Sequence, residues 1–369
     1  CGDRSRRHRS PAEHSGSLSV KGKPVRIAML GCGFFAQNHL HAWKHLRPDG
    51  AELVAVCDLD AAKAETAGKV FGVPSFNSVG RMLTDAKPDV VDIATRMDSH
   101  KSLCAMLAER GIACIVQKPL APCWDECLEI AETVQRHKAF LAIHENFRFQ
   151  SPMRRVKEIL ESGTIGTPSW ARISFRTGYD VYKNQPYFYD EQRLAILDVG
   201  IHVLDLARVF LGEVAHISCE TQKRNPKVKA EDTATMMLRH DSGAVSIVEC
   251  TYEARKLPDY FPQTMLEIEG NRGSIVLEAD EALRVTSDGV LRRENASTPL
   301  LPWTEQPWHV VQSSVLDANA HFLRCLQDNS KAETDIVDNL KTFALVEAAY
   351  QAANLGKACT PPVWKHNKI

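Results

Sequence analysis

The stretch VRIAMLGCGFFA, residues 25–36, decides the fold class of the first half of this chain. Its first half is apolar and has the length of a buried strand, and two glycines follow at once. Gly31 permits a tight turn, Gly33 lets a phosphate approach the backbone at a helix N-terminus, and Ala36 lets that helix pack closely on the strand. The stretch therefore predicts the phosphate-binding turn of a dinucleotide-binding strand–helix–strand unit.

The second strand of this unit, residues 53–58, ends in an acid. Asp58 stands where a carboxylate binds the hydroxyls of the adenosine ribose. Asp60 follows with no arginine between the two acids, so a 2′-phosphate would meet negative charge. The acids favour NAD over NADP as the cofactor.

Strands and helices keep alternating as far as residue 146, which indicates an α/β fold with a parallel, doubly wound sheet. We expect a dinucleotide-binding Rossmann domain over residues 25–146. After the first unit, helices are expected over residues 60–71, 78–83, 98–110 and 124–137, and strands over residues 90–95, 112–116 and 140–143.

The pattern changes after residue 146, where strand-like segments follow one another with short turns between them. This pattern is typical of an antiparallel sheet. We expect residues 147–369 to form an α+β domain with an open, largely antiparallel sheet, which binds the substrate and mediates oligomerisation. Strands are expected over residues 169–176, 217–221, 233–239, 245–252, 264–268 and 274–277, and helices over 151–161, 198–211, 314–327 and 335–355.

The composition narrows the classes of partner. A net charge of −1 gives no reason to expect a nucleic acid or a membrane surface as a partner. The 11 cysteines are scattered through apolar runs as in a reduced, cytoplasmic protein, and they lack the spacing of a metal site, so no metal is expected. Residues 1–24 are basic and poor in apolar residues, which predicts a disordered tail; a processed export leader is the alternative.

Two groups of residues are candidates for catalysis. Lys118 follows an apolar strand and precedes Pro119, so it lies at the carboxyl end of a central strand, where open α/β sheets bind ligands. Asp198 and His202 are four residues apart near a helix start and therefore lie on one helical face. The alternative for this pair is a helix-capping acid and a surface histidine.

From Val25 onward the chain resembles the Gfo/Idh/MocA oxidoreductases. The resemblance implies NAD-linked oxidation, with Lys118, Asp198 and His202 as the catalytic residues that contact the reacting hydroxyl. The motifs that carry it are GCGFFA (31–36), QKP (117–119), NFRF (146–149), SGTIG (162–166) and DVGIH (198–202).

The same resemblance, together with a Tyr- and Asn-rich loop before Asp198 and a late proline-rich loop, gives two sets of expected binding residues. The expected cofactor-binding residues are Gly31, Gly33, Phe34, Phe35, Ala36, Asp58, Thr95, Arg96, His100, Gln117 and Lys118. The expected substrate-binding residues are Lys118, Asn146, Arg148, Arg176, Tyr179, Asp198, His202 and His309.

The chain departs from the family pattern in two places. Gln117 stands where the family usually has glutamate, and TRMDSH, residues 95–100, stands where it often has Thr-Pro-Asn-x-x-His. Both departures fall at strand ends near the expected position of the nicotinamide ribose.

The resemblance implies a small free sugar or cyclitol as the substrate. His202 titrates in the range needed to take the proton, and Lys118 can stabilise a developing alkoxide, so the identity of the base stays open. The sequences of the glycine turn and of QKP resemble those of the apiose dehydrogenases, which implies oxidation of a short aldose such as D-apiose to a lactone. Inositol or hexose oxidation, a sugar-sensing regulatory protein and an NAD-dependent glycosidase are the alternatives.

The second sheet is expected to have one face without helices. Its outer face would carry Val245, Ile247, Met265 and Ile268. An exposed apolar face marks an interface, so we expect a homo-oligomer, either a dimer or a tetramer.

Overall fold

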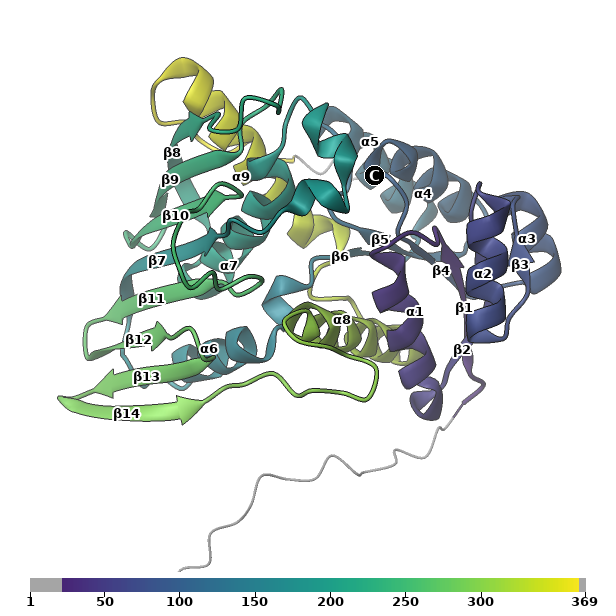
Figure 1. Cartoon of the computed structure of the whole chain (residues 1–369), viewed down its shortest axis with the longest axis horizontal. Helices are drawn as coiled ribbons and strands as arrows, with labels where there is room; N and C mark the ends of the chain where they lie inside the picture. Colours follow the sequence, from purple (N-terminus) through teal and green to yellow (C-terminus); the bar gives the residue numbers. More distant parts are fainter. Residues whose placement is uncertain (1–21, 365–369) are drawn as a thin grey trace, which may run out of the picture.

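The structure, a computed structural model, describes residues 22–364. It contains two β-sheets, one in each half of the molecule, with helices around and between them (Figure 1). The predicted basic tail, residues 1–24, lies outside the described residues as far as Lys21.

The first sheet has six parallel strands in the order β3-β2-β1-β4-β5-β6. This is the strand order of the Rossmann fold, so the predicted doubly wound sheet is confirmed. The strands are β1 (Val25–Leu30), β2 (Ala51–Cys57), β3 (Ser75–Phe76), β4 (Val90–Ile93), β5 (Ala113–Gln117) and β6 (Leu141–His144). The helices of this half are α1 (Ala36–His45), α2 (Ala61–Phe71), α3 (Val79–Ala86), α4 (His100–Glu109) and α5 (Trp124–His137).

Successive residues of each strand in this sheet face opposite layers of helices. On β1, Ala28 and Leu30 belong to the core that contains the apolar faces of α4 and α5. Ile27 faces the other way, toward Trp43 of α1 and Phe322 of α8 (His309–Asp328). A helix from the second half of the chain therefore completes the core of the first sheet. We propose that residues 25–146 bind the dinucleotide and residues 147–369 bind the substrate, with α8 packed on both halves.

The second sheet has eight strands in the order β14-β13-β12-β11-β7-β10-β9-β8, and only β7 and β10 pair in parallel among its described neighbours. The predicted open, largely antiparallel sheet is confirmed. Its strands are β7 (Pro168–Arg176), β8 (Val214–Gln222), β9 (Thr233–His240), β10 (Val245–Thr251), β11 (Met265–Gly270), β12 (Gly273–Leu277), β13 (Ala282–Ser287) and β14 (Val290–Asn295).

The hairpin β13–β14 was not predicted. Its edge strand, VLRREN, is exposed along nearly its whole length, so it lacks the alternation of apolar and polar residues that marks a half-buried strand. The turn between the strands, Asp288-Gly289, is a strong hairpin signal that the sequence does contain.

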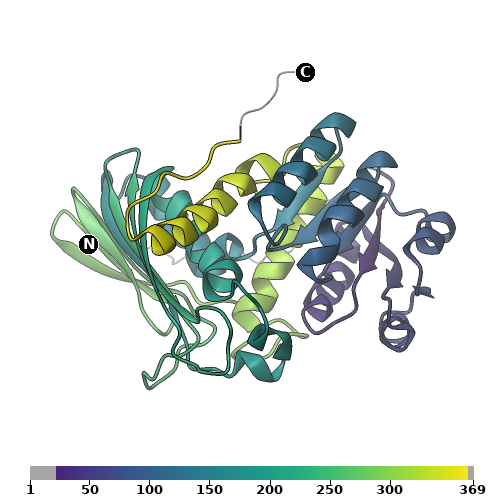
Figure 2. The ribbon, with the colours of Figure 1, turned by 90° about the horizontal axis from the view of Figure 1, so that it is seen from above.

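Two helices fill the space between the second sheet and the first half of the molecule (Figure 2). They are α7 (Ile201–Leu211), which packs on β7 and β10, and α9 (Ile336–Leu355), which packs on β8 and α5. Helix α7 is buried on nearly every side, which explains its almost continuous apolar sequence. The remaining α-helix, α6 (Ser151–Glu161), follows β6 after one short 3₁₀ turn.

The outer face of the second sheet is less apolar than predicted. Val245, Ile247 and Met265 point outward and are partly exposed, but Ile268 is completely buried on the inner face. The prediction for Ile268 was wrong because it shares the strand parity of buried Leu266, not that of Met265.

The structure also places Arg148, an expected substrate-binding residue, inside a buried ion network. It lies in the short 3₁₀ helix η3 (Phe147–Phe149). Its Nε donates to Asp205 Oδ2 at 2.8 Å, and its Nη2 donates to Asp338 Oδ2 at 2.8 Å. Its Nη1 donates to the carbonyl of Glu333 at 3.1 Å, so the guanidinium ties η3 to α7 and α9 and is not directed at a substrate.

We predict that Arg148→Met lowers the free energy of unfolding by about 3–5 kcal/mol, because Asp205 would keep a completely buried charge without its main partner. Urea unfolding followed by circular dichroism measures this change, and Arg292→Met in exposed β14 is the control. An Arg148→Met variant with unchanged stability and a raised KM would contradict this prediction and indicate that Arg148 binds the substrate.

Candidate active site

The glycine turn has the conformation that a dinucleotide needs. Gly31 has φ of +95°, and a Cβ atom there would lie 2.6 Å from the carbonyl oxygen of Ala94. Gly33 has open space around its Cα, and the first N–H groups of α1 follow it. Both features fit a pyrophosphate at this helix N-terminus.

Asp58 follows β2 and is hydrogen-bonded to the glycine turn. Its Oδ2 accepts a hydrogen bond from the backbone N–H of Cys32 at 2.8 Å, and its Oδ1 accepts one from the N–H of Asp60 at 2.9 Å. The carboxylate is thereby held against the glycine turn, at the end of β2. This placement fits a carboxylate that binds the ribose hydroxyls of NAD.

Lys118 follows β5 and reaches from the first sheet into the second half of the molecule. Its Nζ donates to Asp198 Oδ1 at 2.7 Å and to the backbone carbonyl of Asp198 at 2.8 Å. The hydroxyl of Tyr252, just after β10, donates to the other carboxylate oxygen. Burial raises the pKa of Asp198, but Lys118 and Tyr252 lower it by more, so this carboxyl group is ionised.

Asp198 is not the helix cap that the alternative interpretation required. It lies in a π-helical turn, η6 (Ile196–Gly200), that runs directly into α7. Wider turns of this kind occur frequently at functional sites, because they redirect side chains within a helix. The turn directs Asp198 toward Lys118, and His202 follows one turn later on buried α7.

His202 is paired with a residue that was not predicted, Glu145. The ring Nδ1 faces Glu145 Oε1 in a short hydrogen bond, and the ring stacks on Phe147 with centroids 3.8 Å apart. Burial lowers the pKa of His202, and the nearby Lys118 ammonium lowers it further, so the imidazole is neutral. Burial raises the pKa of Glu145 to about 7.

The sequence does contain a signal for Glu145. The residue directly follows β6, whose carboxyl end lies at the same sheet edge as that of β5. Tyr252 was missed as well, because only its contact with Asp198 distinguishes it from other aromatic residues after a strand.

Other expected cofactor residues near this edge differ in their exposure and in their hydrogen-bond partners. Phe34 is 54% exposed beside the glycine turn, and the hydroxyl of Thr95 bonds that of Ser99 at 2.7 Å. Arg96 pairs with Glu191 at 3.1 Å, across the two halves of the chain. His100 is buried between the carbonyls of Leu120 and Thr95, where burial lowers its pKa.

Two further expected substrate residues, Asn146 and Arg176, differ in where their side chains lie. Asn146 is buried, and its amide donates to Ser314 Oγ at 2.7 Å. Arg176 ends β7 on the outer face of the second sheet, because Phe175 next to it points into the core. The structure therefore does not bring Arg176 to Lys118.

Tyr179 lies in an aromatic cluster that reaches the glycine turn. Its ring stacks on Phe261 with centroids 4.1 Å apart, and both rings meet Trp308 edge to face. Trp308 also meets Phe34 edge to face, with ring centroids 5.7 Å apart. Expected His309 follows Trp308 at the start of α8, where its Nδ1 lies 3.2 Å from the carbonyl of Pro307.

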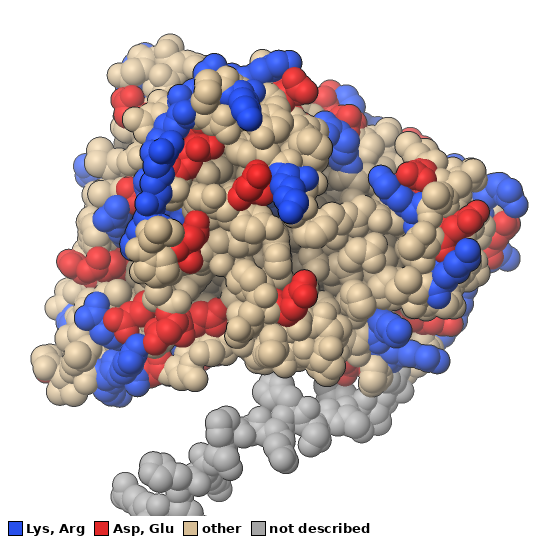
Figure 3. All heavy atoms as spheres, viewed as in Figure 1, with Lys and Arg blue, Asp and Glu red and all other residues tan. Residues whose placement is uncertain are grey.

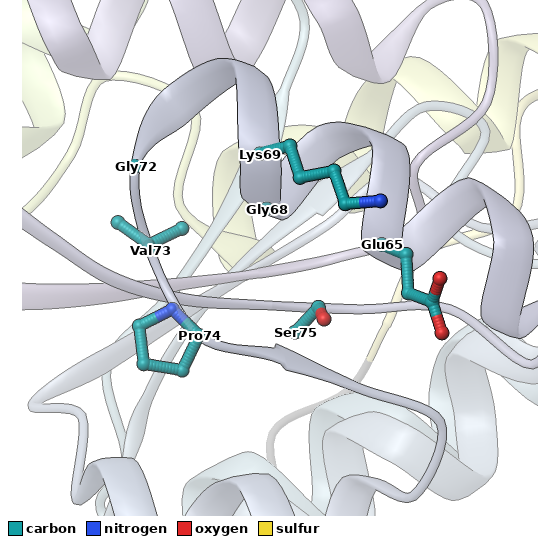
Figure 4. Close-up of a pocket in the computed structure, with 7 residues that line it drawn as sticks. All are labelled: Glu65, Gly68, Lys69, Gly72, Val73, Pro74 and Ser75. Carbon is teal, nitrogen blue, oxygen red and sulfur yellow. The ribbon is translucent and has the colours of Figure 1, made fainter.

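The surface between the two halves is mostly uncharged in the view of Figure 3, and Lys and Arg side chains gather toward its edges. A hollow elsewhere, beside the end of α2 and β3, is lined by Glu65, Lys69 and Pro74 (Figure 4). None of the predicted site residues lines that hollow.

No cluster of three or more His, Cys, Asp or Glu side chains among residues 22–364 is arranged to hold a metal ion. No helix in the same range combines the length and apolar character of a membrane span.

Family models match both halves of the chain. Residues 25–145 match the oxidoreductase family with an NAD-binding Rossmann fold, and residues 153–276 match the GFO/IDH/MocA C-terminal domain. A D-apiose dehydrogenase of Rhizobium rhizogenes is 42% identical over 90% of this chain and 96% of its own length. A D-apiose dehydrogenase of Paraburkholderia graminis is 40% identical over 91% of this chain and 89% of its own length.

Solved structures agree with this result. An oxidoreductase from Agrobacterium radiobacter in complex with NAD⁺, L-tartaric acid and magnesium superposes with a TM-score of 0.89 at 41% identity, covering 92% of this chain and 98% of that one. Levoglucosan dehydrogenase in complex with NADH and levoglucosan, 21% identical, has a TM-score of 0.81 over 92% of this chain and 100% of its own, which shows the shared fold. The chain therefore belongs to the Gfo/Idh/MocA family of NAD-dependent oxidoreductases.

Proposed function

We propose that this protein is an NAD-dependent sugar dehydrogenase that oxidises D-apiose, or a closely similar short aldose, at the anomeric carbon to a lactone. The observation that carries the proposal is the meeting of Lys118 with Asp198 beside the neutral, buried His202, at the edge of the first sheet. The two D-apiose dehydrogenases that are about 40% identical over most of their length support the choice of sugar.

The proposed reaction moves one proton and one hydride. The anomeric hydroxyl loses its proton, the C1–H bond breaks as hydride leaves, and C1 and O1 form the carbonyl of the lactone. When bound, NAD supplies the hydride acceptor. The side chains of this chain must therefore bind the sugar, take the proton and stabilise the oxygen as negative charge develops.

His202 is the base that the geometry favours. When Glu145 is ionised, it accepts the Nδ1–H of His202, which leaves the lone pair on Nε2. The carboxylate then stabilises the imidazolium that forms as the proton arrives, in the way of a base held by a third group. A positioned base contributes roughly 10²–10⁴-fold to the rate.

Lys118 has a different role in this proposal. Its ammonium group already donates two hydrogen bonds to Asp198 and carries a third N–H. That donor can bind the sugar oxygen and stabilise its developing charge. Asp198 and Tyr252 hold the ammonium in place.

We also propose a homo-oligomer that forms through the outer face of the second sheet. Apolar residues there lie on neighbouring strands: Met237, 55% exposed, is in register with Ile247, and Val245 is in register with Trp170. The two pairs lie two residues apart on β10 and form one apolar patch, bordered by Arg172 and Arg239, and an exposed apolar patch is typical of an interface.

We place the protein in the cytoplasm. The ten cysteines between residues 22 and 364 are free thiols, and nearly all of them are buried, which is typical of cysteines in a protein of a reducing compartment.

The first test is a substrate panel followed by NADH absorbance. D-apiose should be oxidised faster than hexoses, inositols or hydroxy acids, and its methyl glycoside should not react, because its anomeric oxygen carries no proton. Lys118→Met should lower kcat by about 10²-fold or more, whereas Lys69→Met in exposed α2 should not. Turnover of acids but not of sugars would refute the substrate class, and turnover of the methyl glycoside would refute the anomeric position.

The second test concerns Glu145. The pKa of about 7 predicts that kcat/KM rises with pH through this value, because only the ionised carboxylate leaves the lone pair on His202 Nε2. Glu145→Gln should lower the maximal rate by about 10²-fold and move the acidic limb to lower pH, since the imidazolium loses its counter-charge. Glu109→Gln, at an exposed end of α4, is the control. An unchanged pH profile in Glu145→Gln would show that Glu145 does not act through His202.

The third test concerns the interface. Ile247→Glu should convert the oligomer into monomers in sedimentation velocity, because each copy would bury a charge in the apolar patch. Val290→Glu on β14, where Val290 is 62% exposed, should leave the oligomer intact. A parent protein that sediments only as a monomer at micromolar concentration would rule out the oligomer.

A further inference from the structure

A chain of buried hydrogen bonds ends at the backbone of Lys118. Asp92 of β4 lies 2.8 Å from His39 Nδ1, and the indole of Trp43 donates to the same carboxylate oxygen at 2.7 Å. His39 Nε2 lies 3.1 Å from Gln117 Nε2, and Gln117 Oε1 accepts the backbone N–H of Lys118 at 2.7 Å. Asp92 and His39 are completely buried, and Gln117 nearly so.

The direction of every bond in this chain follows from its two ends. The N–H of Lys118 can only donate, so the oxygen of Gln117 must face it and the amide nitrogen must face His39. That nitrogen donates, so His39 Nε2 accepts and carries no proton. His39 Nδ1 therefore carries the proton and donates it to Asp92.

Asp92 accepts both hydrogen bonds at this end of the chain. Burial raises the pKa of Asp92, but its contacts with His39 and Trp43 lower it, so this carboxyl group is ionised. His144 of β6 lies beside His39 with ring centroids 4.3 Å apart. Burial lowers the pKa of His144 to about 3, so this neighbouring ring is neutral.

We propose that Asp92, His39 and Gln117 are positioning residues that hold the backbone of Lys118, and that the glutamine keeps His39 neutral. This inference rests on the proposed role of Lys118 as the group that stabilises the sugar oxygen. It also gives the departure at residue 117 a physical meaning, because the amide nitrogen makes a bond that a carboxylate could not make to an unprotonated ring nitrogen.

A glutamate at position 117 would change the network without changing its net charge. The new carboxylate could accept the N–H of Lys118 with one oxygen, but its other oxygen would face a ring nitrogen without a proton. His39 would then take up a proton and become an imidazolium between Asp92 and the new carboxylate. Compared with a chain that has glutamate at position 117, this chain lacks one negative charge at that residue and one proton on His39. The net charge of the network is therefore the same in both.

The test is Gln117→Glu, compared with Gln351→Glu on an exposed turn of α9 as the control. Selective ¹⁵N labelling of histidine reports the protonation of His39 in the free protein, with His39→Gln used for the assignment. In the parent, Nε2 of His39 should carry no proton at neutral pH. In Gln117→Glu, both ring nitrogens should be protonated at neutral pH.

The kinetic readout separates positioning from a structural role. In Gln117→Glu, kcat should fall with rising pH in a range where the kcat of the parent is flat, because His39 would lose its proton there and its bare ring nitrogen would face the carboxylate that holds Lys118. The double variant Gln117→Glu/His39→Gln should lack that fall, because the titrating group is gone.

Two outcomes would overturn the inference: a protonated Nε2 in the parent, or a Gln117→Glu pH profile identical to that of the parent. The spectroscopic readout needs no substrate, so it stands even if no sugar is oxidised. Failure of the proposed function is recognised separately, as a parent protein that is inactive on the whole sugar panel.

Discussion

The contact between Lys118 and Asp198 is the interaction on which the rest of the site depends. It joins the edge of the first sheet to the π-helical turn at the start of α7, so it fixes the two halves relative to each other. A partly buried ion pair is stable only if its remaining groups are also bonded. The backbone carbonyl of Asp198 and the hydroxyl of Tyr252 meet that need.

The fold and the three central residues could be predicted because their signals are local. A glycine turn between two strands, a lysine that ends a strand, and two polar residues four positions apart are all visible within short stretches. Glu145 has a local signal that the prediction did not use, since it directly follows β6, whereas Tyr252 is distinguished only by its contact with Asp198, 54 residues away in the sequence. Only the packing of α7 between the sheets brings them to the site.

Arg148 and Ile268 illustrate the opposite error. Arg148 lies next to a strand end that does contribute to the site, yet its side chain turns into an ion network with Asp205 and Asp338. Ile268 differs from Met265 only in strand parity, but that parity decides which face of the sheet it occupies. The direction of the Arg148 side chain was not available from neighbouring residues. For Ile268 it was, because residues 265 and 268 are three positions apart in one strand and cannot lie on the same face.

The packing of α8 on the first sheet also affects how the chain folds while it is synthesised on the ribosome. The six strands of that sheet are complete at His144, whereas α8 ends only at Asp328. Until then, Ile27, Ile115 and their neighbours have no cover from Phe322 and the rest of this helix. The nascent first half therefore emerges with an open apolar face, which exposes it to aggregation and makes its maturation wait for nearly the whole chain.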